Sequence, residues 1–154
     1  MIIQRWQTLL LFIAAVMMAL FSFGSLGQIN TLNDTFNISA LGIKNITNQN
    51  SEYDVPAIYV FAMSLISVVL TVIAIFSYKN LKFQRSLCKM TTLLIMACCL
   101  CLFLDVNYTA NVMEGTVGWS SLVASPFIAL IAVVCAWRLI NSDKKKLDSL
   151  DRIR

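Results

Sequence analysis

Two cysteines, Cys98 and Cys101, form a Cys-x-x-Cys pair, the spacing used by reactive dithiols. In a membrane protein such a pair would suggest a thiol oxidase that passes electrons to a quinone. The pair lies in the middle of an apolar run, however, and the two outer loops, where substrate thiols would arrive, contain no cysteine. We therefore interpret Cys98, Cys99, Cys101 and Cys135 as small buried hydrophobic residues, and Cys88 as a thiol at the membrane interface.

Transport chemistry would need polar side chains along an apolar run. Ser64, Ser67 and Thr71 recur at helical spacing in one run, and Asp105 lies near the end of another. Together they define the hypothesis of a small transporter subunit with these four residues on its path. The competing interpretation places the hydroxyls in a close helix contact and Asp105 in water at the interface. Because no acidic residue lies deep in a run, the sequence favours the second interpretation.

Other catalytic constellations are missing from the sequence. The chain has no histidine, and Asp105 is the only carboxylate within a predicted span, so we expect no metal site. It contains no glycine-rich phosphate loop, no nucleophile elbow and no pair of carboxylates at catalytic spacing. We expect a non-enzymatic protein without catalytic residues or cofactors.

The elements that would position these residues are apolar runs. Of the 154 residues, 58% are hydrophobic and only 13% are charged, which is typical of an integral membrane protein. Each of four runs can cross a bilayer as a helix of about 20 residues. The predicted fold is an all-α bundle of four transmembrane helices in a single domain, 1–154, with spans at about 6–27, 55–78, 87–108 and 119–140. A rival interpretation of the first run is a signal peptide cleaved near Ser25–Gly27.

The charged residues predict an orientation. The net charge is +4, and 11 of the 12 cations lie in the head, in the middle turn up to Lys89, at Arg138 near the end of the last span, and in the tail 141–154. The two other loops contain only Lys44. Cytoplasmic loops carry such an excess of lysine and arginine. We expect both termini and the basic segment Tyr78–Cys88 in the cytoplasm. Because the cations flank membrane runs, we expect the lipid bilayer and its anionic head groups as partners, and no nucleic acid.

The first outer loop, Gln28–Asp54, has a pattern of its own. Thr35–Ser39 alternates in the manner of a strand and Leu41–Ile43 offers a second one, which predicts a small β-hairpin. Glycosylation sequons would support an alternative, a claudin-like eukaryotic surface protein, and they begin at Asn33, Asn37, Asn45 and Asn107. The cysteine pair and tryptophan motif expected of that class are missing from this loop.

Three stretches resemble a family of bacterial membrane proteins, domain of unknown function 4293, found in Bacteroidetes. They are the start Ile3–Thr8, the centre Ile75–Asn80 running into Gln84–Cys88, and the ending Asp151–Arg154. The resemblance covers the whole chain. Family members have an Asn-Arg pair where this chain has Trp137 and Arg138, so only the arginine carries over. The resemblance implies a multi-pass protein of the bacterial inner membrane and brings no activity.

These observations favour an accessory or structural protein that acts through its basic cytoplasmic face. Asn80 and Gln84 carry no charge and cannot serve orientation, so we expect another molecule to contact them. That molecule is a partner protein or a lipid head group, and a homo-oligomer is a further option. The predicted contact residues are Lys79, Asn80, Lys82, Gln84, Arg85, Arg138, Arg152 and Arg154.

Overall fold

The computed structural model describes residues 2–32, 34–46, 55–78 and 80–151, with side chains from residue 6 to residue 144 of these ranges. The described chain forms four long helices: α1 (Ile2–Phe23), α2 (Ile58–Phe76), α3 (Leu81–Val112) and α4 (Ser125–Asp151). The strands are β1 (Ser25–Asn30), β2 (Thr35–Ser39), β3 (Gly42–Asn45), β4 (Val55–Pro56) and β5 (Thr116–Trp119), and a 3-10 helix, η1 (Ser121–Ala124), precedes α4. All four long helices contain a stretch long and apolar enough to cross a membrane.

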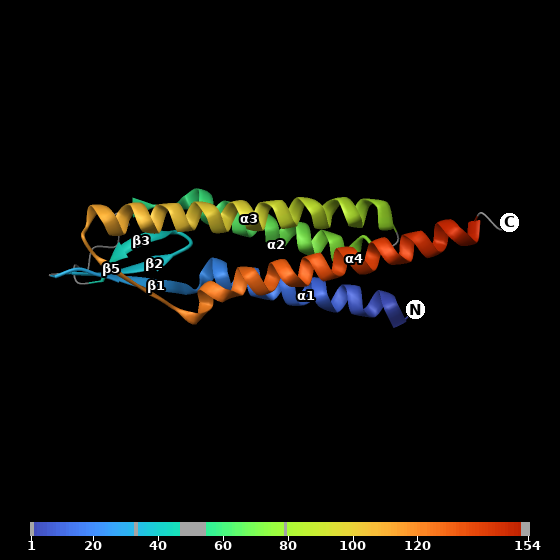
Figure 1. Cartoon of the computed structure of the whole chain (residues 1–154), viewed down its shortest axis with the longest axis horizontal. Helices are drawn as coiled ribbons and strands as arrows, with labels where there is room; N and C mark the ends of the chain where they lie inside the picture. The colour runs from blue at the N-terminus through green and yellow to red at the C-terminus, as the bar shows by residue number, and fades with distance from the viewer. Residues whose placement is uncertain (1, 33, 47–54, 79, 152–154) are drawn as a thin grey trace.

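The helices form a bundle in which α1 and α3 each pack against both α2 and α4. The sheet closes one end of this bundle, which we call the sheet end (Figure 1). The opposite end holds the start of α1, the short turn between α2 and α3 and the last turns of α4, and we call it the terminal end (Figure 1). The two loops at the sheet end and the single turn at the terminal end are thus kept apart by the length of the helices.

The sheet has the strand order β4-β3-β2-β1-β5, and every neighbouring pair is antiparallel. The predicted hairpin is present as β2 and β3, with Ile38 opposite Ile43. The all-α prediction is wrong, because strands from both loops join that hairpin. Strand β1 follows α1 almost directly and pairs on its other side with β5, so that Ile29 lies opposite both Phe36 and Val117.

Several predicted span boundaries also differ from the structure. The ends predicted at residues 27, 55 and 119 lie in strands β1, β4 and β5, and α3 begins at Leu81 rather than at residue 87. The strands contain apolar residues such as Leu26 and Ile29 that are buried under the sheet. Hydropathy cannot distinguish a short apolar strand from the continuation of an apolar helix, which explains the error. Ser125 and Pro126 begin α4 and do not kink it.

Small residues allow the helices to approach closely. Ala129, Ala132 and Ala136 recur at intervals of three and four residues, a spacing that predicts a packing seam on α4, and all three are buried. Ala14 of α1 is buried as well. Without a hydrophobic driving force between helices in lipid, such short side chains favour association by letting the backbones come into van der Waals contact.

The pairing of β1 with β5 depends on a glycine, and this gives a test of the sheet. A Cβ atom on Gly27 would lie 2.6 Å from the carbonyl oxygen of Gly118, whereas a Cβ on Gly118 would have its nearest neighbour at 3.6 Å. We expect Gly27→Ala to lower the free energy of unfolding by about 1–3 kcal/mol, the usual cost of overpacking. Thermal unfolding in detergent, followed by circular dichroism, measures this change.

Gly118→Ala on the facing strand is the matched control. It should leave the midpoint unchanged or raise it slightly, because it restricts the unfolded chain without a clash. Equal midpoints for both variants would contradict the described pairing of β1 with β5.

Candidate functional site

The turn between α2 and α3 is the centre of the predicted contact surface. Helix α2 ends at Phe76 and α3 begins at Leu81. The side-chain oxygen of Asn80 accepts a hydrogen bond of 3.3 Å from the backbone N–H of Phe83, which makes Asn80 the N-cap of α3. Most of the basic segment Tyr78–Cys88, which was predicted to connect two helices, therefore forms the beginning of α3.

Gln84 differs from the prediction, because its side chain is only 1% exposed and so does not lie on a docking surface. Its Nε2 atom donates a hydrogen bond of 3.1 Å to the carbonyl oxygen of Ala74. Ala74 lies in the last turn of α2, where carbonyl groups have no partner within their own helix. Gln84 of α3 thus satisfies the end of α2, while its Oε1 atom finds no hydrogen-bond partner among the described residues.

A second buried glutamine joins the other two helices at this end. Gln7 of α1 is 2% exposed, and its Nε2 atom donates a hydrogen bond to a carboxylate oxygen of Asp143 in α4. Asp143 belongs to the predicted tail, which continues α4 without a break as far as Asp151. Sequence reasoning missed this contact. The available signal was a glutamine within an apolar stretch, where an unpaired amide would be costly.

Charged side chains surround this buried layer. Lys82 and Arg138 are exposed and Arg85 is half-buried, with its Cζ atom 6.0 Å from the centre of the Trp137 ring. Lys89 lies one turn further along α3 than Arg85, and Lys144 follows Asp143 in α4, so both belong to the terminal end. Among the side chains described there, the only carboxylate is Asp143, which is already bonded to Gln7. The predicted contact residues Lys79, Arg152 and Arg154 lie outside the described residues.

The four residues of the transport hypothesis are not gathered on one path. Ser64, Ser67 and Thr71 are buried, and their hydroxyl groups donate to carbonyl oxygens of their own helix at 2.6–2.8 Å. Ser22 of α1 also donates to the hydroxyl of Ser64 at 2.8 Å. Asp105 is half-buried on α3 and accepts a hydrogen bond from the hydroxyl of Tyr59. Ser64 thus joins α2 to α1, whereas the hydroxyls of Ser67 and Thr71 bond to the backbone of α2.

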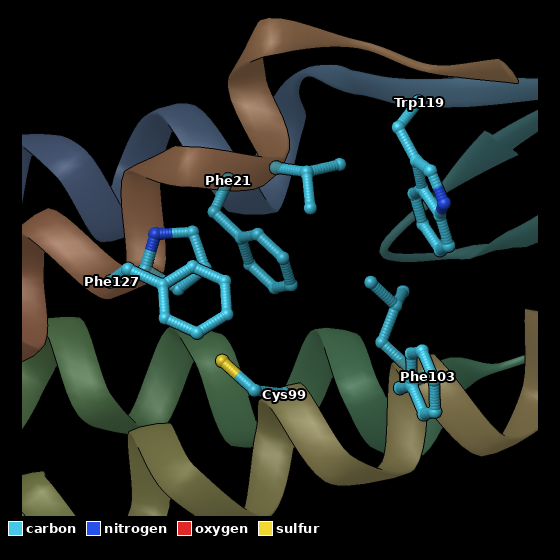
Figure 2. A pocket seen from close by; sticks show the side chains of 8 residues that line it. Phe21, Cys99, Phe103, Trp119 and Phe127 are labelled. Atoms are coloured by element: carbon cyan, nitrogen blue, oxygen red, sulfur yellow. The ribbon is translucent and has the colours of Figure 1, made fainter.

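The cysteines lie on α3 and α4, and all five are free. Cys98 is buried, and its thiol donates to the carbonyl oxygen of Val60 at 3.6 Å, which packs α3 against α2. The thiol of Cys99 faces a cavity near the sheet (Figure 2). Within the described ranges, no three side chains of the metal-binding types come together.

The hydrogen bond from Gln84 to Ala74 gives a stability test. We expect Gln84→Ala to lower the free energy of unfolding by about 1–3 kcal/mol, because it leaves a buried carbonyl group without a partner. Asn80→Ala should cost about 1 kcal/mol through loss of the N-cap. Both changes are measured by thermal or denaturant unfolding in detergent.

Lys82→Ala provides the control, since it lies on the same turn of α3 with an exposed side chain. Its stability should remain within about 0.5 kcal/mol of the parent, as is usual for surface substitutions. A Gln84→Ala protein as stable as the Lys82→Ala protein would show that the amide does not support the end of α2.

Comparisons with known proteins show which family the chain is related to. No curated protein sequence is significantly similar to the chain. One family model, described as Domain of unknown function (DUF4293), matches residues 3–153, which include all four helices and the sheet. The match thus spans Gln7, Gln84 and Asp143, the polar side chains that join the helices at the terminal end. Because the match covers nearly the whole sequence, the chain belongs to the DUF4293 family.

Proposed function

We propose that the protein is a non-enzymatic accessory protein of the bacterial inner membrane that crosses the bilayer four times. Both termini and the turn between α2 and α3 lie in the cytoplasm, and the sheet lies in the periplasm. The protein acts by docking an acidic surface of a partner protein on its basic terminal end. The observation that carries this proposal is the set of exposed cations held around a rigid, hydrogen-bonded end of the bundle.

The distribution of charge supports the orientation. The described cations at the terminal end are Lys82, Arg85, Lys89, Arg138 and Lys144. The sheet half of the molecule has Lys44 as its only described cation, together with the carboxylates of Asp34, Asp105 and Glu114. A membrane protein places its lysine- and arginine-rich loops in the cytoplasm, so the terminal end is assigned to that side.

The hydrogen bonds of Asn80 and Gln84 leave the cations as the groups at the terminal end that are available for docking. Asn80 and Gln84 cap the helix ends, so the fold itself accounts for these neutral residues and no partner has to contact them. The exposed cations at this end are Lys82, Lys89 and Arg138. Arg85 is partly covered by its contact with Trp137. One exposed ion pair is worth only about 0–1 kcal/mol. Several cations must therefore face several carboxylates, which gives a partner surface of complementary charge.

The orientation is tested by labelling single cysteines with a membrane-impermeant maleimide in a cysteine-free background. Position 82 serves for the terminal end, because Cys88 is 1% exposed and its burial would prevent labelling on either side of the membrane. Position 32 serves for the sheet end, because Leu32 is fully exposed. In intact cells we expect Leu32→Cys to react and Lys82→Cys to react only after the membrane is opened. The reverse pattern would invert the assigned orientation.

Docking is tested with a photo-crosslinking amino acid at position 82 or, as the control, at position 32. From position 82 we expect one discrete cross-linked protein, and Arg138→Glu should lower its yield several-fold by adding like-charge repulsion. Arg138→Lys should retain most of the yield, because it keeps the charge. The labelling experiment, repeated on the Arg138→Glu protein, verifies that its orientation is unchanged. A discrete product from position 32 alone would move the docking face to the sheet end.

A further inference from the structure

The contact between α3 and α4 is incomplete on one side and leaves two hollows. The first, nearer the terminal end, is a groove of about 510 Å³. Its walls are Leu93 and Met96 of α3 and Val134 and Trp137 of α4, and Lys89 and Thr92 complete its lining. The hydroxyl of Thr92 donates to the carbonyl oxygen of Cys88 at 2.8 Å, so the groove is polar only where Lys89 lies.

The second hollow lies where the sheet meets the bundle and has a volume of about 230 Å³. Figure 2 shows Phe21, Cys99 and Phe127 around one part of it and Phe103 and Trp119 around the other. Its lining residues come from α1, α3, β5, η1 and α4. Strand β5 and the 3-10 helix η1 place Trp119 and Val123 over the end of the bundle. The lining is apolar throughout, so the hollow suits a hydrocarbon.

Helical spacing places both hollows on one seam. On α3, the lining residues Lys89, Thr92, Met96, Cys99 and Phe103 follow one another at intervals of three and four residues, so they form one stripe along the helix. The same is true of α4, where Phe127, Val134 and Trp137 are seven and three residues apart. At 1.5 Å per residue, the stripe on α3 is about 21 Å long. That exceeds half of the hydrocarbon core of a bilayer, which is about 30 Å thick.

Positive charge lies at only one mouth of the seam. Arg85 precedes Lys89 by four residues on the same stripe of α3, and its guanidinium group lies over the Trp137 ring that walls the groove. A phosphate group at this mouth would meet two cations, and arginine and lysine are the side chains that bind phosphate most strongly. Under the proposed orientation, this mouth opens toward the cytoplasmic leaflet, where lipids with anionic head groups attract basic residues.

We propose that the seam between α3 and α4 is a binding site for one anionic phospholipid. Its phosphate lies between Arg85 and Lys89, and one acyl chain follows the stripe past Met96 toward Cys99 and Phe103. The proposal deepens the proposed function and rests on it for the leaflet that supplies the lipid. A partner helix fits the seam less well, because helices in membranes associate through small residues, and Met96, Phe103 and Phe127 are bulky and exposed.

The two tryptophans of the seam allow a direct test, because bromine atoms on an acyl chain quench nearby indole fluorescence. Variants that retain only Trp137, at the basic mouth, or only Trp119, at the far hollow, are reconstituted with a minority of brominated phosphatidylglycerol in phosphatidylcholine. We expect quenching in excess of the mole fraction of the brominated lipid for both variants. Bromines near the head group should act more strongly on Trp137, and bromines near the chain terminus more strongly on Trp119.

The basic mouth is tested by substitution. Arg85→Gln with Lys89→Gln should abolish the excess quenching and leave the unfolding midpoint close to that of the parent. Lys82→Gln with Lys144→Gln removes the same net charge from the same end and should retain the excess. Brominated phosphatidylcholine in phosphatidylglycerol should quench by less than its mole fraction predicts, because the unbrominated anionic lipid occupies the seam.

Other outcomes would overturn the proposal. Quenching that follows the mole fraction of both lipids would show that the seam holds no specific lipid. Oxidative cross-linking of two chains through Met96→Cys, together with proportional quenching, would assign the seam to a second copy of the protein. Because reconstituted vesicles offer the anionic lipid in both leaflets, these results do not depend on the orientation, which the labelling experiment tests separately.

Discussion

Backbone groups at the end of an apolar helix need partners, and most of this structure follows from that need. Neither a packed interior nor lipid offers water to an unpaired carbonyl or amide. At the terminal end, Asn80 and Gln84 supply side chains to the backbone of α3 and α2. At the sheet end, where the loops are longer, the backbone groups pair with one another in five strands. Both ends are ordered by the same constraint with different means.

The two ends consequently present different chemistry. The sheet uses its backbone groups internally and packs apolar residues such as Ile29 and Ile38 beneath it. The terminal end buries the amide side chains of Gln7 and Gln84 and exposes cations such as Lys82. Between them, the hydroxyls of Ser22 and Ser64 join α1 to α2 while α3 and α4 leave a seam. The few polar groups of the protein therefore fall into two sets. Some make hydrogen bonds that stabilise the fold, and the others are exposed at the surface.

The sequence predicted the parts of the fold that depend on composition and strict periodicity. Four apolar helices, the alanine seam on α4 and the hairpin of β2 and β3 were all foreseeable from residue types alone. The remaining strands were not, because β1 and β5 contain apolar residues that continue the hydropathy of the adjoining helices. The contacts within the candidate site were not predicted. Gln84 was assigned to a surface since a neutral amide in a basic segment suggests recognition, and only its position opposite Ala74 shows that it caps a helix.

The place of β1 in the sheet has a consequence for biosynthesis. Strand β1 pairs with β2 a few residues later in the chain, but its other edge pairs with β5, and Asn30 and Thr116 are separated by 86 residues. Chains are completed from the N-terminus, so this edge stays open while two further helices are made and inserted. An open strand edge is a template for another chain. The interval before β5 emerges is therefore the stage at which two neighbouring nascent chains can exchange strands, and the length of chain between β1 and β5 sets how long that stage lasts.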